Sequence, residues 1–313
     1  MLGSKLTKLL NIKYPIIQGG MAGISDSILV SAVANAGGLG VLGSGFLSAK
    51  WLEEEINKTK KLTDKPFAVN LMLQNVHIPE LVKVIIKNKI PIVTTGGGNP
   101  LPLFPHLKKV GIKIITVIGV VRLAKKMEEN GADVIVVEGM ESGGHIGKKT
   151  TLTLIPQTKK VLKNTPLVAA GGIYDGKTTA AMFVLGADGV QMGTRFLASK
   201  ECDIHEDYKE AILDATDEDI ITVAEFTGHP VRLIKNELSE KVKKLEEKNP
   251  FPEEVRADAY SSSKLLNANI QQAPLLCGLC AGAISEIKTC KQILEETMQD
   301  AERILKGATY KNE

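Results

Sequence analysis

The sequence of 313 residues contains few aromatic residues, few cysteines and little excess of charge of either sign. Aromatic residues make up 4% of the chain and hydrophobic residues 43%, which excludes a disordered chain and fits an ordinary globular one. The 39 basic and 36 acidic residues are dispersed and give a net charge of +3, so the composition gives no support to nucleic-acid binding. We expect small-molecule partners.

The four cysteines are Cys202, Cys277, Cys280 and Cys290. Four are too few for a disulfide scaffold in a chain of this length, which favours a reducing cytoplasm. Cys277 and Cys280 have the spacing of a dithiol motif, but no second Cys or His pair completes a zinc site. We therefore interpret them as small core residues and expect no metal.

The N-terminal region lacks the apolar stretch of a signal peptide, because Lys5, Lys8 and Lys13 interrupt it, so we expect no export. Residues 27–49 carry no charge and are long enough to span a bilayer. They hold five glycines, four serines and Asn35, however, and we expect them to be buried in the protein and not in a membrane.

What the sequence does contain is a repeated pattern of short apolar runs, each followed by a segment of helical periodicity. Eight runs begin 21 to 33 residues apart, a spacing that fits strand, loop and crossover helix. Eight such units predict an α/β protein with a (β/α)₈ barrel, also called a TIM barrel. A doubly wound sheet remains the alternative, because the sequence does not report closure. The runs are residues 15–20, 38–43, 67–73, 92–97, 113–118, 134–139, 167–172 and 189–194.

The pattern stops after Thr194. Residues 200–287 contain charged helical segments and Pro-containing loops, which predict a second, smaller and mainly helical domain. The last periodic segment, residues 289–305, could return to the barrel as its eighth helix. We therefore predict a barrel formed by residues 1–199 and 288–313, and a small helical domain formed by residues 200–287.

The loops after the strands build the active site of such a barrel, so chemically unusual strand ends are the candidates. Gly171 and Gly172 follow the seventh predicted strand, and Gly193 and Thr194 follow the eighth. These residues expose backbone amides where barrels commonly hold a phosphate, which predicts a phosphorylated ligand. The alternative is that the glycines only turn tight loops.

His145 lies between glycines in the loop after the sixth predicted strand, which also contains Glu138 and Glu141. Its titration range suits proton transfer near neutral pH, so we predict a catalytic role. The alternative is a histidine that only shapes the loop. Asn70 is a polar residue in a run that should be buried, and it either ties the barrel mouth together or, as we favour, binds a ligand. The role of His229 is left undecided.

The sequence lacks the dinucleotide-binding motif of a Rossmann unit, which is Gly-x-Gly-x-x-Gly after a strand, with an acidic residue about 20 positions later. A nicotinamide cofactor would therefore bind at the barrel mouth and not on a Rossmann unit.

Several strings together resemble the flavin-dependent enoyl-acyl-carrier-protein reductase II family of bacterial fatty acid synthesis, within the nitronate monooxygenase superfamily. The resemblance covers most of the chain, and nitronate monooxygenases share its His-containing loop. The strings are residues 18–22, 36–40, 65–70, 94–100, 138–147, 170–173, 191–196 and 228–232.

The resemblance implies a barrel that binds FMN non-covalently and uses NADH or NADPH to reduce a trans-2-enoyl thioester on acyl carrier protein. It implies that His145 orients the substrate or supplies the proton that reaches the α-carbon. Members of the family are often homodimers, and some respond to a monovalent cation. The residues implied in FMN binding are Gly171, Gly172, Gly193 and Thr194 at the phosphate, Gly20, Met21 and Ala22 at the isoalloxazine, and Asn70, Glu138 and Gln191 as polar contacts.

The chain departs from the family pattern at residues 277–282, where a glutamine of the usual string is missing, and at residues 241–258, which match poorly. Two other functions remain open. The first is a nitronate monooxygenase, in which His145 would take a proton from a nitroalkane and oxygen would reoxidise the flavin. The second is a barrel that binds a phosphorylated ligand for regulation and catalyses no reaction.

Overall fold

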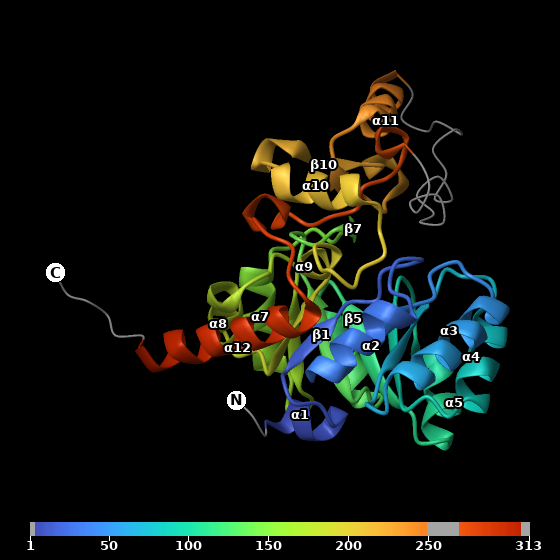
Figure 1. Ribbon diagram of the computed structural model, residues 1–313. Coiled ribbons are helices and arrows are strands. Elements are labelled where there is room, and N and C mark those ends of the chain that lie inside the picture. Colours follow the sequence, from blue (N-terminus) through green and yellow to red (C-terminus); the bar gives the residue numbers. More distant parts are fainter. Residues whose placement is uncertain (1–3, 249–268, 308–313) are drawn as a thin grey trace.

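The computed structural model describes residues 4–248 and 269–307 (Figure 1). Eight parallel strands form one sheet in the order β1-β9-β8-β6-β5-β4-β3-β2, and helices surround it. The predicted barrel is therefore confirmed. The strands are β1 (Ile16–Gln18), β2 (Val41–Gly43), β3 (Ala68–Met72), β4 (Ile92–Gly96), β5 (Lys113–Ile118), β6 (Val134–Glu138), β8 (Leu167–Ala170) and β9 (Gly189–Met192).

The two edge strands of this sheet, β1 and β2, are joined through Leu39. Leu39 N donates to Ile16 O and Gln18 N donates to Leu39 O, both at 2.9 Å. The fully buried Gln18 side chain adds a third link, because its Oε1 accepts from Val41 N at 3.0 Å. These hydrogen bonds close the barrel and exclude the doubly wound sheet.

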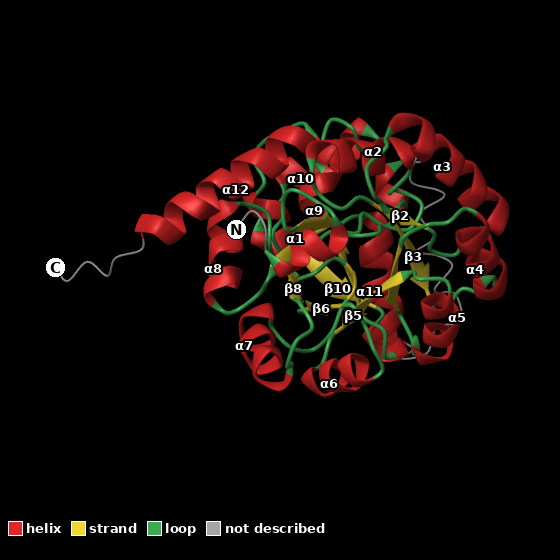
Figure 2. Cartoon of the chain, turned by 90° about the horizontal axis from the view of Figure 1, so that it is seen from below, coloured by secondary structure: helices red, strands yellow, loops and turns green. Residues whose placement is uncertain are grey.

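The core lies in two layers because the Val- and Ile-rich strands are buried on both faces. One layer fills the barrel itself, and Leu6 and Leu10 of α1 (Lys5–Leu10) belong to it. Figure 2 shows α1 lying across the end of the barrel at which the strands begin. The other, larger layer lies between the strands and the outer helices. With one end filled by apolar side chains, the opposite end, where the strands finish, is free to form a site.

The outer ring is completed by the last helix, α12, which packs against α8 and α2 (Figure 2). Leu294 of this helix lies so close to Gly38 that a Cβ there would be 2.6 Å from its Cδ2. The final segment thus returns to the barrel as the sequence predicted. The outer helices are α2 (Ser27–Ala36), α3 (Ala49–Leu62), α4 (Ile78–Lys87), α5 (Phe104–Lys109), α6 (Val121–Glu129), α7 (Thr151–Val161), α8 (Gly176–Val184) and α12 (Cys290–Gly307).

The uncharged residues 27–49 form α2 of the outer ring and β2 of the barrel, and most of their side chains are buried within the protein, as expected. Across the described ranges, no helix combines the length and the apolar character that crossing a membrane requires.

The annex, defined here as residues 200–287, lies over one end of the barrel (Figure 1). Besides helices, its described part contains an antiparallel hairpin that the sequence analysis did not predict. The second hairpin strand also pairs with β7 (Gly144–His145), in the loop after β6. Residues 249–258 of the poorly matching segment lie outside the described residues. Between β9 and α12 lie α9 (Thr194–Leu197), α10 (Glu206–Asp214), β10 (Ile220–Val223), β11 (Val231–Ile234) and α11 (Glu237–Lys248), with 3-10 helices at Asp217–Asp219, Glu225–Thr227, Ile270–Gln272 and Ala281–Ala283. One further 3-10 helix, Leu101–Leu103, precedes α5 in the barrel.

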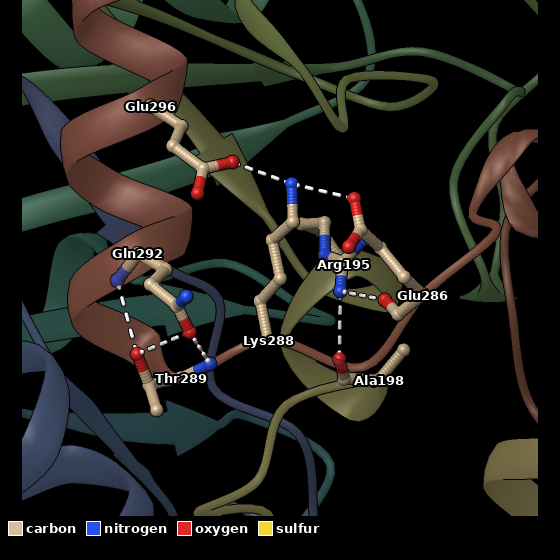
Figure 3. A network of polar contacts seen from close by, with 7 residues as sticks. All are labelled: Arg195, Ala198, Glu286, Lys288, Thr289, Gln292 and Glu296. Atoms are coloured by element: carbon tan, nitrogen blue, oxygen red, sulfur yellow. Dashed lines mark hydrogen bonds and ion pairs between the residues drawn. The ribbon is translucent and has the colours of Figure 1, made fainter.

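The chain leaves the barrel and returns to it at neighbouring points, because Ser199 and Lys288 form a parallel bridge. The buried Arg195 guanidinium supports this junction (Figure 3). Its Nη2 donates to Ala198 O and to Glu286 O, both at 2.7 Å. The contact joins the end of α9 to the returning segment, so it fixes the annex relative to the barrel.

Candidate functional site

A cavity of about 590 Å³ opens at the carboxyl ends of the strands, between the barrel and the annex. Every site residue predicted from the sequence lines it, so the fold brings all of them together. Their individual roles remain predictions. These residues are Gly20, Met21, Ala22, Asn70, Glu138, His145, Gly171, Gly172, Gln191, Gly193 and Thr194.

The wall formed by the loops after β1 and β3 is closely packed. A Cβ on Gly20 would lie 2.6 Å from the Cβ of Asn70, so only glycine fits at this position. Asn70 Nδ2 donates to Thr94 Oγ1 at 2.9 Å and thereby links β3 to β4. Asn70 also lines the cavity. It therefore ties the barrel mouth together and is in a position to contact a ligand, which combines the two interpretations of the sequence.

The wall formed by the loops after β8 and β9 is built from glycine backbone. Gly171 and Gly172 have positive φ angles of 98° and 75°, a conformation that favours glycine. Asp175 caps the following helix, α8, because its carboxylate accepts from Thr178 N at 2.8 Å. A Cβ on Gly193 would meet only the Met21 Sδ, at 3.9 Å. Beside Gly193 the wall thus leaves open space next to backbone, as a bound phosphate group requires, whereas a Cβ on Gly171 would lie 2.9 Å from Thr151 Oγ1.

The loop after β6 is held by the annex. Its short strand β7 pairs with β11, with His145 opposite Val231 and Gly144 opposite Arg232. Ile146 N also donates to Pro230 O at 3.0 Å. Although glycines flank it, His145 is therefore fixed in position by the hairpin that the sequence analysis missed.

A second histidine, His229, comes from the turn of this hairpin and also lines the cavity. The two rings form a T-shaped pair with centroids 6.4 Å apart. Burial, and to a smaller extent the charge of His229, lower the pKa of His145. His145 is therefore mainly neutral at pH 7, with one ring nitrogen able to accept a proton.

The two carboxylates of the same loop have different surroundings. Glu138 is deeply placed in the cavity, and burial raises its pKa to about 7, although the Ser142 hydroxyl acts in the opposite direction. Glu141 instead accepts two hydrogen bonds of 2.9 Å, from Thr151 N and Thr151 Oγ1, at the start of α7. Of the two carboxylates, Glu138 is thus the one able to exchange a proton with a ligand, while Glu141 holds a helix.

The sequence analysis assigned no site role to the segment that returns from the annex. Leu276, Gly278 and Cys280 line the cavity, and Gly278 N donates to Thr194 Oγ1 at 2.8 Å. Cys277 and Cys280 are free and buried, and Cys277 belongs to the core as predicted, whereas Cys280 also lines the cavity. The available signal was the departure from the family pattern at residues 277–282. Within the described residues no group of three or more His, Cys, Asp or Glu side chains is arranged to hold a metal.

Comparison with known proteins defines the class as flavin-dependent oxidoreductases. The family model for nitronate monooxygenase matches residues 3–81 and 76–300. The chain therefore belongs to the nitronate monooxygenase family.

Its relatives differ in the activities that their names state. A "Probable nitronate monooxygenase" of Staphylococcus saprophyticus is 36% identical over 296 residues, covering 80% of this chain and 83% of that protein. A hydroxy-methyl-oxo-octahydro-indene-carboxyl-CoA dehydrogenase of Mycobacterium tuberculosis is 29% identical over 96% of both chains. The structure of FabK from Thermotoga maritima superposes with a TM-score of 0.93 and 40% identity over 98% of both chains. A nitroalkane oxidase from Streptomyces ansochromogenes superposes with a TM-score of 0.83 and 25% identity, over 97% of this chain and 99% of that one.

Proposed function

We propose that the protein is an FMN-dependent enoyl-acyl-carrier-protein reductase that consumes NADH or NADPH. The observation that carries this proposal is the similarity to FabK, an enoyl-acyl-carrier-protein reductase II, at a TM-score of 0.93 over 98% of both chains. This similarity includes the annex as well as the barrel. A relative whose name describes a coenzyme A thioester as substrate also matches over 96% of this chain, which supports a thioester as the substrate class.

The residues of the cavity fit FMN. The space beside Gly193, which a Cβ would enter, and the glycine backbone at Gly171 and Gly172 suit the phosphate. The amides of Asn70 and Gln191 line the same cavity and can donate to or accept from the polar edge of the ring. The chemistry that FMN supplies when bound is hydride transfer from NADH or NADPH to the β-carbon of the enoyl thioester.

The protein's own contribution is to position the substrate and to provide the proton for the α-carbon. We assign this proton to His145, which the annex hairpin holds at the cavity wall. Because its pKa is lowered, the protonated form is in the minority at pH 7, and turnover should decrease as the pH rises. The annex and the loop after β6 would together exclude water from the reacting carbons.

The remaining parts of the proposal rest on the resemblance to the reductase family. The substrate is carried on acyl carrier protein, the protein forms a homodimer, and a monovalent cation supports activity. Size-exclusion chromatography with light scattering would test the dimer. Activity in potassium compared with a large organic cation would test the cation.

The second candidate is a nitronate monooxygenase, and the neutral state of His145 favours it, because a neutral imidazole can take a proton from a nitroalkane. The 36% identity to a "Probable nitronate monooxygenase" supports the same candidate. Membership of a family of oxidoreductases counts against the third possibility, a barrel without catalytic activity.

The deciding experiment is anaerobic NADH oxidation by the FMN-loaded protein, with and without a crotonyl thioester of acyl carrier protein or coenzyme A. We expect enoyl-dependent oxidation that yields the saturated thioester. His145→Ala should lose most turnover, roughly 10²-fold or more, and keep its flavin. His106→Ala, a change at an exposed histidine of α5, is the matched control. Oxygen uptake with a nitronate, and no response to the thioester, would replace this proposal by the second candidate.

A further inference from the structure

We propose that a basic rim at the cavity mouth binds the phosphate group of a co-substrate, an inference that rests on the proposed reduction of a thioester by NADH or NADPH. The basic rim consists of Arg122, Lys148 and Lys149. All three side chains are exposed, and no carboxylate of the described residues forms an ion pair with any of them. Unpaired cations beside a cavity attract anionic ligands.

The two lysines lie only three and four residues after His145 in the chain. They directly follow Gly147, which lines the cavity in the same loop as His145. Met140 N donates to Lys149 O at 2.7 Å, so the chain around the lysines is fixed. Four residues of chain reach at most about 14 Å, which bounds the distance between the Cα atoms of His145 and Lys149. A ligand that reacts beside His145 can therefore contact these lysines with its far end.

Arg122 joins the lysines from the neighbouring loop. It lies in the first turn of α6, shortly after Gly119, which also lines the cavity. A Cβ on Gly147 would lie 4.0 Å from Gly119 O, so the two loops touch, and α6 and α7 pack side by side (Figure 2). The first turn of α6 contains no acidic residue, and Val120 provides no side-chain cap. The free N–H groups of this helix end add to the positive potential of the rim.

Phosphate is the anion that both proposed co-substrates carry. The pantetheine arm of coenzyme A or acyl carrier protein ends in a phosphate at the side away from the thioester. NADH carries a pyrophosphate between its two nucleosides. When the reacting carbon of either molecule lies deep in the cavity, the phosphate must lie toward the mouth. Lysine binds phosphate as a mobile point charge, and arginine adds directed N–H groups.

Calorimetric binding of coenzyme A and of phosphate-free pantetheine to the FMN-loaded protein tests the rim without turnover. We expect Lys148→Ala/Lys149→Ala to weaken coenzyme A binding by about 5- to 20-fold and to leave pantetheine binding unchanged. Added salt should weaken binding to the wild type more than to the variant. The matched control is Lys125→Ala/Lys126→Ala, which removes two adjacent exposed lysines later in α6.

A second titration distinguishes the two sources of phosphate. The rate of anaerobic flavin reduction at increasing NADH concentration gives the affinity for NADH in the same variants. A loss for coenzyme A alone assigns the rim to the pantetheine arm, a loss for NADH alone assigns it to the dinucleotide, and a loss for both assigns it to each in turn. Unchanged binding of both ligands overturns the inference, and so does an equal loss for pantetheine.

The outcomes also separate this inference from the proposed function. A wild-type protein that binds coenzyme A through the rim but reduces no enoyl thioester would refute the function and leave the rim. A protein that reduces crotonyl-coenzyme A and crotonyl-pantetheine with equal KM, and whose lysine variant keeps the wild-type KM for both thioesters and for NADH, would refute the rim and leave the function.

Discussion

Glu138 and Glu141 are three positions apart in one loop, and their environments give them different properties. The carboxylate of Glu141 is saturated by Thr151 at the start of α7. That of Glu138 faces the cavity, where burial raises its pKa to about 7. A carboxylate that is removed from water and has no cationic partner is destabilising when ionised, so ionisation of Glu138 should destabilise the flavin-free protein.

Replacement of Glu138 by glutamine should therefore stabilise the flavin-free protein at high pH. The pKa of Glu138 is about 7 in the folded protein, compared with 4.5 for an ordinary glutamate. The free energy of unfolding therefore decreases as the pH rises through this interval, because ionisation is less favourable in the folded state. The cost at pH 8 is at most about 3 kcal/mol. Thermal unfolding at pH 5 and pH 8 measures it. We expect Glu138→Gln to raise Tm by several degrees at pH 8 and little at pH 5, and an equal change at both values would contradict the assignment.

His229 should contribute to the protonation behaviour of His145, although burial is the larger cause of its lowered pKa. The charge of His229 contributes to the lowered pKa of His145, so His229→Ala should raise the pKa of His145. The limb of the pH–activity profile that reports the protonation of His145 should then move to higher pH. His229→Lys places a permanent positive charge at this position and should not produce this increase. An NMR titration of the His145 ring protons checks the shift without relying on turnover. A profile unchanged in His229→Ala would mean that burial alone lowers the pKa.

The elements of the cavity differ in how much they tolerate added volume, and two glycines form a matched pair. Gly20→Ala places a methyl group against Asn70 at 2.6 Å and should destabilise the fold by about 1–3 kcal/mol. Gly193→Ala points a methyl group into open space and should leave stability nearly unchanged. If FMN phosphate occupies that space, the second variant should still bind flavin at least tenfold more weakly, which flavin fluorescence on dilution measures. Full flavin retention in Gly193→Ala would exclude a phosphate there.

The strands and the hairpin also differ in how far the sequence predicts them. The barrel strands are continuous Val- and Ile-rich runs with regular spacing, so their existence can be predicted from local pattern. The strands Ile220–Val223 and Val231–Ile234 have four residues each, and one of them pairs with Gly144–His145 from a distant part of the chain. Such short strands are stabilised by their partners, and periodicity in a single segment does not report pairing.

The same distinction holds for the site. Gly171, Gly193 and His145 follow strands, and a barrel brings its strand ends together whatever the loops contain, so their meeting could be predicted. Leu276 and Cys280 could not be placed, because they come from the segment that returns from the annex. Their position depends on contacts such as the hydrogen bond from Gly278 to Thr194, which no local pattern encodes.

At the scale of the whole molecule, the barrel and the annex share one cavity, so the contacts at their junction should influence both stability and activity. Arg195 is 6% exposed and donates to two carbonyl oxygens across the point where the chain leaves and returns. Its Nε is buried and has no hydrogen-bond partner among the described residues. The arginine is thus held by two directed bonds to backbone, and it carries a charge that burial disfavours.

Arg195→Ala should destabilise the protein by about 2–4 kcal/mol, because it leaves both carbonyl oxygens unpaired and opens a cavity. Lys288→Ala should cost less, since Lys288 forms its ion pairs with Glu286 and Glu296 at a partly exposed position (Figure 3). Urea unfolding of the FMN-loaded protein measures the free energy of unfolding of each variant and so tests this order of destabilisation. The control is Arg303→Ala, at an exposed ion pair on α12, which should lie within about 0.5 kcal/mol of wild type. If Arg195→Ala were no more destabilising than Arg303→Ala, the annex would be held to the barrel by other contacts, with the β7–β11 pairing at His145 as the next to be tested.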